Sequence, residues 1–371
     1  MGIKIFHTGD VHIGMRFNKY PEEISKMLRE ARIDVIENMI DMANKSSCNI
    51  FVIAGDLFDK TTGIDKKTIA TVAKHLNKFT GNCIGLLPGN HDFENEMVDL
   101  WKTFNNLVDD KLIFLQEERP YSLKDYGLDA TIYPAPCHSK HSEVNNLAWI
   151  AGEEIDDTII NIGIAHGSLT GISPDLDNMY FNMDLKELEV IPVDVWLLGH
   201  SHIVYPDVLS IDNWKVHNPG TPEPDGMDCK HNGNAWIIDI DKDKNIKSKL
   251  VETGKYRFAD ENYTLSSIED YSRIYNLISK HPENIIARIG VSGIVDEDAY
   301  KHRQKVFKEI EEKILYLIFE DSDLKIRINK EKIEKEFTQD SFPEQFLFAL
   351  QEDEEALQMA YEMIMEVKND N

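Results

Sequence analysis

The sequence predicts a mixed α/β fold in which a largely buried sheet is layered by helices. Two observations predict this fold class. Short apolar runs of strand length recur along the first two hundred residues, and stretches with helical spacing lie between them. Strands that alternate with helices usually form a sheet whose faces are covered by the helices. A hydrophobic share of 42% and a charged share of 29% are ordinary for a globular protein, so we expect a sizeable core.

The expected elements follow in chain order. β-Branched and apolar content marks five strands in the first two hundred residues, which are Ile3–Phe6, Ile50–Ala54, Cys83–Leu87, Ile159–Ala165 and Val193–Leu198. A helix opens at Pro21 and carries apolar residues at helical spacing from Ile24 to Ile40. After His202 the pattern becomes β-rich, with expected strands at Trp214–His217, Ala235–Ile240 and Ser248–Glu252.

A change of composition near Lys255–Glu261 divides the chain of 371 residues. We expect residues 1–256 to form one domain and residues 257–330 to form a small α/β domain with its own core. The expected helix, strand, helix and strand of this second domain are Leu265–Ser279, Ile285–Val295, Ala299–Leu315 and Tyr316–Ile328. Residues 331–371 are polar and acidic, and we expect them to form a helical C-terminal tail.

Cysteine use, hydropathy and charge restrict the class of protein. The four cysteines lie far apart without a Cys-x-x-Cys pair, so we expect neither disulfides nor a zinc ribbon, and free thiols suit a reducing cytoplasm. Because no apolar run reaches about 18 residues, we expect no membrane span. The net charge of −26 would repel a polyanion. Either the substrate is small, or metal charge and a separate partner supply the attraction.

Each of the five apolar runs leads to residues of types that bind metals. These segments are Asp10-Val11-His12, Gly55-Asp56-Leu57-Phe58-Asp59, Gly89-Asn90-His91-Asp92, His166-Gly167 and Gly199-His200-Ser201-His202. One such segment is usually a surface loop, but five of them after five strands predict a metal centre. Ligands at the carboxyl ends of neighbouring strands converge on one crevice. Asp, His and Asn ligands without thiolates favour Mn²⁺, Fe or Zn²⁺ over Ca²⁺.

The order of these motifs across residues 9–202 resembles the calcineurin-like metallophosphoesterases, except that Ala165 precedes His166 where the family pattern has glycine. The resemblance implies a core layered α/β/β/α, with two packed sheets flanked by helices. It also implies two divalent cations that lower the pKa of a shared water and so produce a hydroxide nucleophile. The implied ligands are Asp10, His12, Asp56 and His202 for one cation, and Asp56, Asn90, His166 and His200 for the other.

The same resemblance assigns His91 to the scissile phosphate, where it would stabilise charge or protonate the leaving oxygen. Asp59 would fix the orientation of this histidine and keep it cationic. A structural hydrogen-bond donor is the alternative for His91. Arg16 could reach a substrate phosphate, although a surface arginine is the simpler interpretation. Protein Ser/Thr phosphatases expect arginines where this chain has Lys60 and Pro88, which disfavours that subgroup.

Within the family, the sequence is more similar to the SbcD-type subunits of DNA-repair exonucleases, which are related to the Mre-type nucleases. The segments that carry this similarity are residues 8–14, residues 54–59 and Asn218-Pro219-Gly220-Thr221-Pro222. The similarity implies a Mn²⁺-dependent exonuclease that acts on DNA ends in repair and recombination, with an SbcC-like coiled-coil ATPase as partner. Residues 257–330 would cap the nuclease domain, and residues 331–371 would dock onto the ATPase. A homodimer is compatible with the sequence.

Several interpretations stay open at this point. A phosphodiesterase for small substrates such as cyclic nucleotides would use the same centre, although it would not need residues 255–371. A scaffold without activity is disfavoured because all seven ligand residues and His91 are present. The apolar stripe from Leu357 to Val367 either docks a partner or packs on its own chain. The basic stretch from Lys301 to Lys308 either contacts DNA or is a solvated helix face. His138 and His141 are interpreted as loop residues.

Overall fold

The computed structural model describes residues 2–93, 99–173, 175, 179–278 and 281–369. The chain divides into two compact units, Met1–Phe258 and Ala259–Asn371. Every residue predicted to bind a metal lies in the first unit, and each unit is described by itself.

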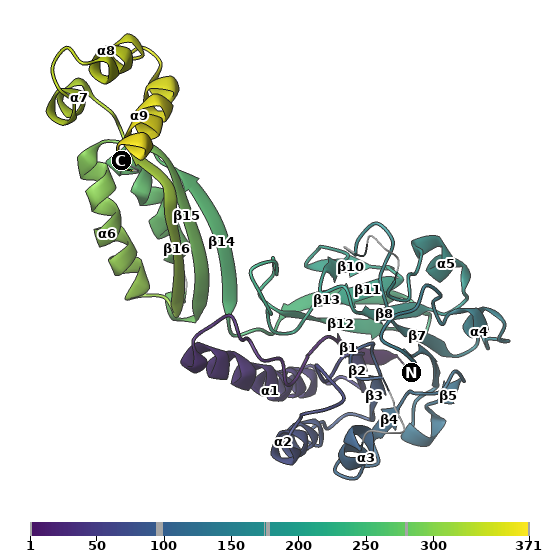
Figure 1. The fold of residues 1–371 in the computed structure, drawn as a ribbon. Helices are drawn as coiled ribbons and strands as arrows, with labels where there is room; N and C mark the ends of the chain where they lie inside the picture. The colour runs from purple at the N-terminus through teal and green to yellow at the C-terminus, as the bar shows by residue number, and fades with distance from the viewer. Residues whose placement is uncertain (1, 94–98, 174, 176–178, 279–280, 370–371) are drawn as a thin grey trace. The chain divides into compact units, whose positions relative to one another are not determined.

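The first sheet of the first unit has β1 in its interior (Figure 1). Its strands run in the order β10 (Ser210–Asp212), β13 (Ile246–Glu252), β12 (Asn234–Ile240), β1 (Ile3–Thr8), β2 (Ile50–Ala54), β3 (Cys83–Leu87) and β4 (Leu112–Phe114). The strands β1 to β4 are parallel, whereas β12 runs antiparallel to β1. The carboxyl ends of β1, β2 and β3 therefore meet at one edge of this sheet.

The second sheet packs against the first. Its strands run in the order β5 (Tyr121–Ser122), β6 (Ala130–Ala135), β7 (Ile160–His166), β8 (Val195–Gly199), β11 (Val216–Pro219) and β9 (Val204–Tyr205). The pairs β6–β7, β7–β8 and β8–β11 are parallel. The carboxyl ends of β7 and β8 therefore lie at the same edge of this sheet. Two of the predicted ligand segments begin at these strand ends.

Alternation along the strands separates the buried layers. In β2, Ile50 and Val52 contribute to the apolar core between the two sheets, whereas Phe51 and Ile53 belong to the core beneath the helices. The first sheet is covered on its outer face by α1 (Glu22–Lys45), α2 (Lys66–Leu76) and α3 (Leu100–Asn105). The short helices α4 (Ala148–Ala151) and α5 (Leu185–Val190) pack on the outer face of the second. The predicted α/β/β/α layering is therefore confirmed.

Strand β6 was not predicted from the sequence. It contains Pro134, which lacks a backbone N–H and normally argues against an interior strand. The structure tolerates it because β5 pairs only with Thr131 and Ile132, so the outer edge of β6 carries no partner strand at Pro134. The carbonyl of Pro134 instead accepts a hydrogen bond from the indole of Trp149 at 3.0 Å.

The second unit contains a sheet in the order β14 (Arg257–Thr264), β15 (Ile285–Val295) and β16 (Tyr316–Ile326). The helix α6 (Glu297–Glu311) connects the parallel strands β15 and β16, as expected for a βαβ unit. Strand β14 was missed because its sequence is largely polar. The helix expected at Leu265–Ser279 is a 3₁₀ helix, η2 (Ile268–Ile278), and residue 279 lies outside the described residues. Its buried residues Tyr271 and Ile274 are three apart, which matches the 3₁₀ repeat.

The C-terminal residues form three helices in the described chain, α7 (Lys330–Glu336), α8 (Phe342–Ala349) and α9 (Glu354–Asn369). They share a small core whose fully or nearly buried members are Ile328, Ile333, Leu347, Leu357 and Tyr361. Ion pairs join Lys325 of β16 to Glu362 and Arg327 to Glu354. These helices thus pack on the end of β16 as part of the second unit. None of the described helices has the length and apolar character that crossing a membrane requires.

Candidate metal centre

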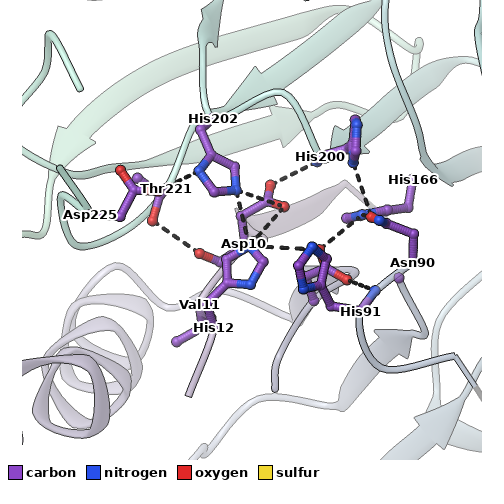
Figure 2. A network of polar contacts seen from close by, with 12 residues as sticks. Asp10, Val11, His12, Asn90, His91, His166, His200, His202, Thr221 and Asp225 are labelled. Carbon is purple, nitrogen blue, oxygen red and sulfur yellow. Dashed lines mark hydrogen bonds and ion pairs between the residues drawn. The ribbon is translucent and has the colours of Figure 1, made fainter. Parts of the chain in front are cut away.

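The predicted ligands follow the strand ends as expected. Asp10 and His12 follow β1, Asp56 follows β2, and Asn90 follows β3, whereas His166 is the last residue of β7. His200 and His202 follow β8. All seven side chains converge at one edge of the sandwich. Figure 2 labels six of them, and Asp56 lies 3.6 Å from His12 and 3.3 Å from His166.

The backbone of these segments is unusual. Five of the seven predicted ligand residues have positive φ angles, which are 54° at Asp10, 49° at His12, 51° at Asp56, 102° at His200 and 51° at His202. Such conformations cost about 1–3 kcal/mol each in a residue other than glycine and occur mainly at functional sites. The concentration of this strain at the strand ends indicates that the site geometry, and not local propensity, determines the fold of these loops.

The glycine before Asp56 leaves room for a ligand ring. A Cβ atom at Gly55 would lie 2.0 Å from Nδ1 of His166, and Gly55 has a φ of +95°. A Cβ atom at Gly89 would similarly lie 2.1 Å from Oδ1 of Asp56. The Gly-Asp and Gly-Asn pairs in the sequence are therefore required by close approach of the side chains.

The variant Gly55→Ala tests this packing, and Gly63→Ala is its matched control. Gly63 also has a positive φ, +82°, but a Cβ atom there would meet nothing within 4 Å. Both variants incur about 1–2 kcal/mol for the left-handed backbone. Only Gly55→Ala should also displace His166, and so lower metal affinity, as measured by calorimetric titration beside thermal unfolding. Equal metal affinity in the two variants would contradict the argument.

One group of ligand atoms, which we call the first half-site, comprises Asp10, His12, Asp56 and His202. The Nε2 atoms of His12 and His202 lie 3.0 Å apart. Oδ1 of Asp10 is 3.6 Å from Nε2 of His202, and Oδ2 of Asp56 is 3.6 Å from Nε2 of His12. The ligand atoms of Asp10, His12 and His202 all lie within 4.8 Å of one another.

The second half-site comprises Asp56, Asn90, His166 and His200. Oδ1 of Asn90 lies 3.0 Å from Nε2 of His166 and 3.0 Å from Nδ1 of His200. Oδ2 of Asp56 is 3.3 Å from Nε2 of His166, so Asp56 borders both half-sites. Figure 2 shows His202 and His12 on one side of the centre, and Asn90, His166 and His200 on the other.

The donor set fits divalent cations. Two nitrogen ligands bound at about 2.1 Å to one cation lie roughly 3.0–3.4 Å apart, which agrees with the spacing of His12 and His202. Oδ1 of Asp10 is buried and has no hydrogen-bond partner among the described residues. A buried carboxylate oxygen normally requires a partner, and a cation between Asp10 and the two imidazoles would supply it.

The electrostatics of the centre also favour cations. Burial disfavours the charged form of His166, but the carboxylate of Asp56 outweighs burial and raises the pKa of His166 to about 9. Burial likewise opposes charge on His202, whereas the nearby carboxylates of Asp10 and Asp225 raise its pKa to about 10. The negative potential that stabilises a proton on these rings is the potential that attracts a divalent cation.

Contacts of the Nδ1 atoms orient two of the ligand rings. Nδ1 of His166 lies 2.8 Å from the carbonyl of Ala54, and Nδ1 of His202 lies 2.6 Å from Oδ2 of Asp225. Each contact directs Nε2 of the ring toward the centre, as is usual for metal-binding histidines. The sequence did not reveal Asp225, because it lies 23 residues after His202 and outside the motifs.

We expect Asp225→Asn to weaken binding at the first half-site by about 10–100-fold, because an amide orients the ring of His202 less strongly than a carboxylate does. Asp228→Asn is the matched control, since Asp228 is an exposed residue of the same loop. Manganese titration of both variants measures the effect. An unchanged affinity in Asp225→Asn would show that the contact does not position His202.

His91 lies beside both carboxylate and imidazole groups. Its ring centroid is 4.9 Å from that of His12, and its backbone N–H donates to Oδ1 of Asp56 at 2.9 Å. Nδ1 of His91 is 3.1 Å from the backbone carbonyl of Asp59, whereas the Asp59 carboxylate is 3.8 Å from Nδ1 of His12. The contact with His91 is thus made by the backbone carbonyl of Asp59, whereas the carboxylate of Asp59 lies nearer to His12. The role of Asp59 stays a prediction.

Three other residues singled out in the sequence, Arg16, His138 and His141, are exposed. Arg16 is exposed, and its carbonyl accepts a hydrogen bond from Arg29. The exposed His138 lies 3.3 Å from Glu118. His141 is also exposed, but its ring lies 4.9 Å from that of Tyr180. The ring of Tyr180 in turn lies 5.0 Å from His200, which places His141 closer to the centre than its sequence context suggested.

Comparison with known proteins agrees with this geometry. The family model for calcineurin-like phosphoesterase matches residues 3–204. The chain is similar to the uncharacterized metallophosphoesterase YhaO of Bacillus subtilis, at 25% identity over 232 residues. It is also similar to the DNA double-strand break repair protein Mre11 of Methanopyrus kandleri, at 24% identity over 273 residues.

These matches cover part of each protein. They include 60% of this chain with YhaO and 67% with Mre11. The chain spans 53% and 57% of the lengths of these two relatives. The family match covers more than half of the chain and includes all seven predicted ligands. The chain therefore belongs to the calcineurin-like phosphoesterases, a family of metal-dependent phosphoesterases.

Proposed function

We propose that this protein is a Mn²⁺-dependent phosphodiesterase that acts on DNA ends, as the SbcD-type nuclease subunit of a cytoplasmic DNA-repair complex. The observation that supports it most is the convergence of two half-sites that share Asp56, with His91 beside them. A pair of half-sites suits in-line displacement at a phosphodiester, because both the attacking and the leaving oxygen require charge stabilisation.

The residues of the centre have separate roles in this proposal. Bound divalent cations would supply Lewis-acid polarisation of the phosphoryl group and acidify water. Asp10, His12 and His202 hold the first position, and Asn90, His166 and His200 hold the second, with Asp56 shared. His91 would donate a proton from Nε2 to the leaving oxygen, or stabilise its charge, with Nδ1 held by the carbonyl of Asp59.

The similarity to an Mre11 protein supports DNA as the substrate. The net charge of −26 argues that this chain does not hold DNA by charge alone. Consistent with this, three of the four Lys and Arg side chains of α6 are paired with acids, Lys301 with Glu297, Arg303 with Asp321 and Lys305 with Glu309. We therefore propose that residues 257–330 cap the nuclease domain and that a partner contributes most of the DNA contact.

One assay tests the proposed function. The purified chain is incubated with Mn²⁺ and end-labelled duplex DNA, in parallel with bis-p-nitrophenyl phosphate and cyclic AMP. Cleavage of the DNA from its ends and of the small diester is expected. Efficient hydrolysis of cyclic AMP without any cleavage of DNA would instead support the second candidate, a phosphodiesterase for small substrates. The acidic charge and the paired cations of α6 are the observations that favour that candidate.

The tail offers a surface for a coiled-coil ATPase of the SbcC type. An apolar groove of about 590 Å³ is lined by residues of α8 and α9 and by Leu350 between them. The lining residues are Pro343, Phe346, Leu350, Ala356, Met359, Ala360, Met363, Ile364 and Val367. The apolar stripe predicted in this region is divided between two faces. Leu357 is buried in the small core of the tail, whereas Met363 and Val367 are 62% and 63% exposed. We propose that an amphipathic helix of the ATPase occupies this groove.

Substitution on the exposed face tests this docking better than truncation, because removing residues 337–371 would uncover Ile328 and Ile333. We expect Met363→Glu to abolish association with the cognate ATPase and ATP-stimulated DNA cleavage, while hydrolysis of a small diester stays unchanged. Glu366→Gln, an exposed position on the same helix, is the matched control. Pull-down and diester turnover are measured together. Retained association in Met363→Glu would place the docking surface elsewhere.

A further inference from the structure

Arg32 is a buried arginine that the proposed chemistry does not use. It lies in α1 among apolar neighbours and is only 1% exposed. Burial of a guanidinium is costly unless its donors are satisfied. Nη1 donates to the carbonyl of Val11 at 2.6 Å, and Nη2 donates to the carbonyl of Glu223 at 3.2 Å. Its two bonded partners are therefore backbone atoms of two different loops.

Both loops belong to the first half-site. Val11 is the residue between Asp10 and His12, whose backbones are both left-handed. A donor fixed on the carbonyl of Val11 restrains the peptide that joins these two ligands. A strained backbone conformation persists only where several surrounding contacts hold it in place. The hydrogen bond from Arg32 is one such contact.

The second loop holds His202 in place. Glu223 lies two residues before Asp225, whose carboxylate contacts Nδ1 of His202. In the same loop, Oγ1 of Thr221 lies 2.9 Å from the carbonyl oxygen of Asp10 and 2.8 Å from that of Glu223, so its single O–H is shared between the two carbonyls. Figure 2 shows Thr221 and Asp225 on the side of the centre occupied by Asp10 and His202.

This loop is also anchored away from the centre. The carboxylate of Glu223 accepts hydrogen bonds from the backbone N–H groups of Lys255 and Tyr256, both at 2.8 Å. The guanidinium of Arg32 therefore bonds to a loop whose position is fixed from the other side. Because the loop of Glu223 is held rigidly, the side chain of Arg32 can set the distance between this loop and the loop of Val11.

The second half-site is held by different groups. Nδ1 of His166 contacts the carbonyl of Ala54, and the amide of Asn90 donates to the carbonyl of Lys140 at 3.4 Å. Neither of the hydrogen bonds of Arg32 reaches these segments. The two half-sites thus depend on separate supports, although they share Asp56.

We propose that Arg32 is a positioning residue for the first of the two cation positions, because it fixes the loop of Asp10 and His12 to the loop that orients His202. This inference rests on the metal centre of the proposed function. An arginine suits this role better than a lysine, because its planar fork can bond to two carbonyl groups at once. Burial lowers the pKa of Arg32, and the carboxylates of Asp225, Glu223 and Asp59 act against this effect in part.

The test compares metal binding in Arg32→Met, Arg32→Lys, Arg29→Met and the unaltered chain. Arg29 is the matched control, since it lies one turn earlier on α1 and bonds to Glu22 and to the carbonyl of Arg16. Each metal-free protein is titrated with Mn²⁺ by calorimetry, and the electron paramagnetic resonance signal of exchange-coupled Mn²⁺ pairs is recorded. Circular dichroism confirms that each variant is folded.

We expect the unaltered chain and Arg29→Met to bind two Mn²⁺ ions and to give the coupled signal. Arg32→Met should bind one ion with unaltered affinity and the other about 10–100-fold more weakly, with loss of the coupled signal. Arg32→Lys should lie between these limits. Two ions bound with unaltered affinity in Arg32→Met, or equal weakening of both, would overturn the proposal.

If Arg32→Met does not fold, Arg32→Lys decides the question by the same criterion, which is weaker binding of one Mn²⁺ ion and unaltered binding of the other. Fewer than two ions on the unaltered chain would contradict the proposed metal centre itself, and not the role of Arg32.

Discussion

Asp56→Asn should lose both cations and hydrolysis together. Oδ2 of Asp56 lies 3.6 Å from Nε2 of His12 and 3.3 Å from Nε2 of His166, so this one oxygen borders both half-sites. Burial raises the pKa of Asp56, but His166 and His12 more than offset burial, and the carboxylate stays ionised well below its usual pKa. Asparagine keeps the shape but removes the charge that would hold both cations. Asparagine also tolerates the positive φ of 51° at this position.

Metal content by mass spectrometry and turnover of bis-p-nitrophenyl phosphate are the measurements for this variant. Asp34→Asn, an exposed position on α1, controls for the loss of one acidic residue. Two bound cations with normal turnover in Asp56→Asn would show that Asp56 does not bridge the half-sites.

His91→Ala should keep both cations and lose rate. General acid–base groups contribute on the order of 10²–10⁴-fold, so a loss in this range is expected. The ring of His91 is half-buried and its Nδ1 contacts the carbonyl of Asp59, so we assign the proton transfer to Nε2. The close approach of His91 to His12 and Asp56 also makes it a possible ligand, and the metal content of the variant separates the two roles.

Two substrates with different leaving groups distinguish between the two catalytic roles of His91. If His91 protonates the leaving oxygen, its removal should slow DNA cleavage far more than hydrolysis of bis-p-nitrophenyl phosphate, whose leaving group needs little protonation. If it only stabilises charge on the phosphoryl group, the two rates should fall by similar factors. Lost metal would make His91 a ligand, and near-normal rates on both substrates would make it structural.

The strands and the ligand order were predictable because both follow from local sequence. β-Branched runs predict buried strands, and in an α/β sheet the residues after such strands meet at one edge. Residues 50–54 are β2 as predicted, and the strand expected at Val193–Leu198 is β8, which ends at Gly199 just before His200. The resemblance of the motifs added the pairing of the two sheets, which strand patterns alone do not specify.

The supports of the centre were not predictable, because they are long-range contacts. Arg32 lies 191 residues from Glu223, and nothing in the helical pattern of α1 distinguishes a buried arginine from an exposed one. Asp225 is one acid among many in an acidic chain. Strand β6 was hidden by Pro134, and β14 by its polar sequence, because whether a strand can form there depends on the neighbouring strand and on burial.

The ligands come from both halves of the sandwich. Asp10, Asp56 and Asn90 follow strands of the first sheet, whereas His166, His200 and His202 belong to the second. Bound cations would therefore link the two sheets to each other. An isolated sheet, or a partly folded chain in which only one sheet has formed, has no complete site. Cation binding then adds to the free energy of unfolding, by about 2.7 kcal/mol per site when the free cation is at 100 times its dissociation constant. Depletion of cations would loosen the sandwich at its catalytic edge first, where the strained loops lose the bonds that hold them.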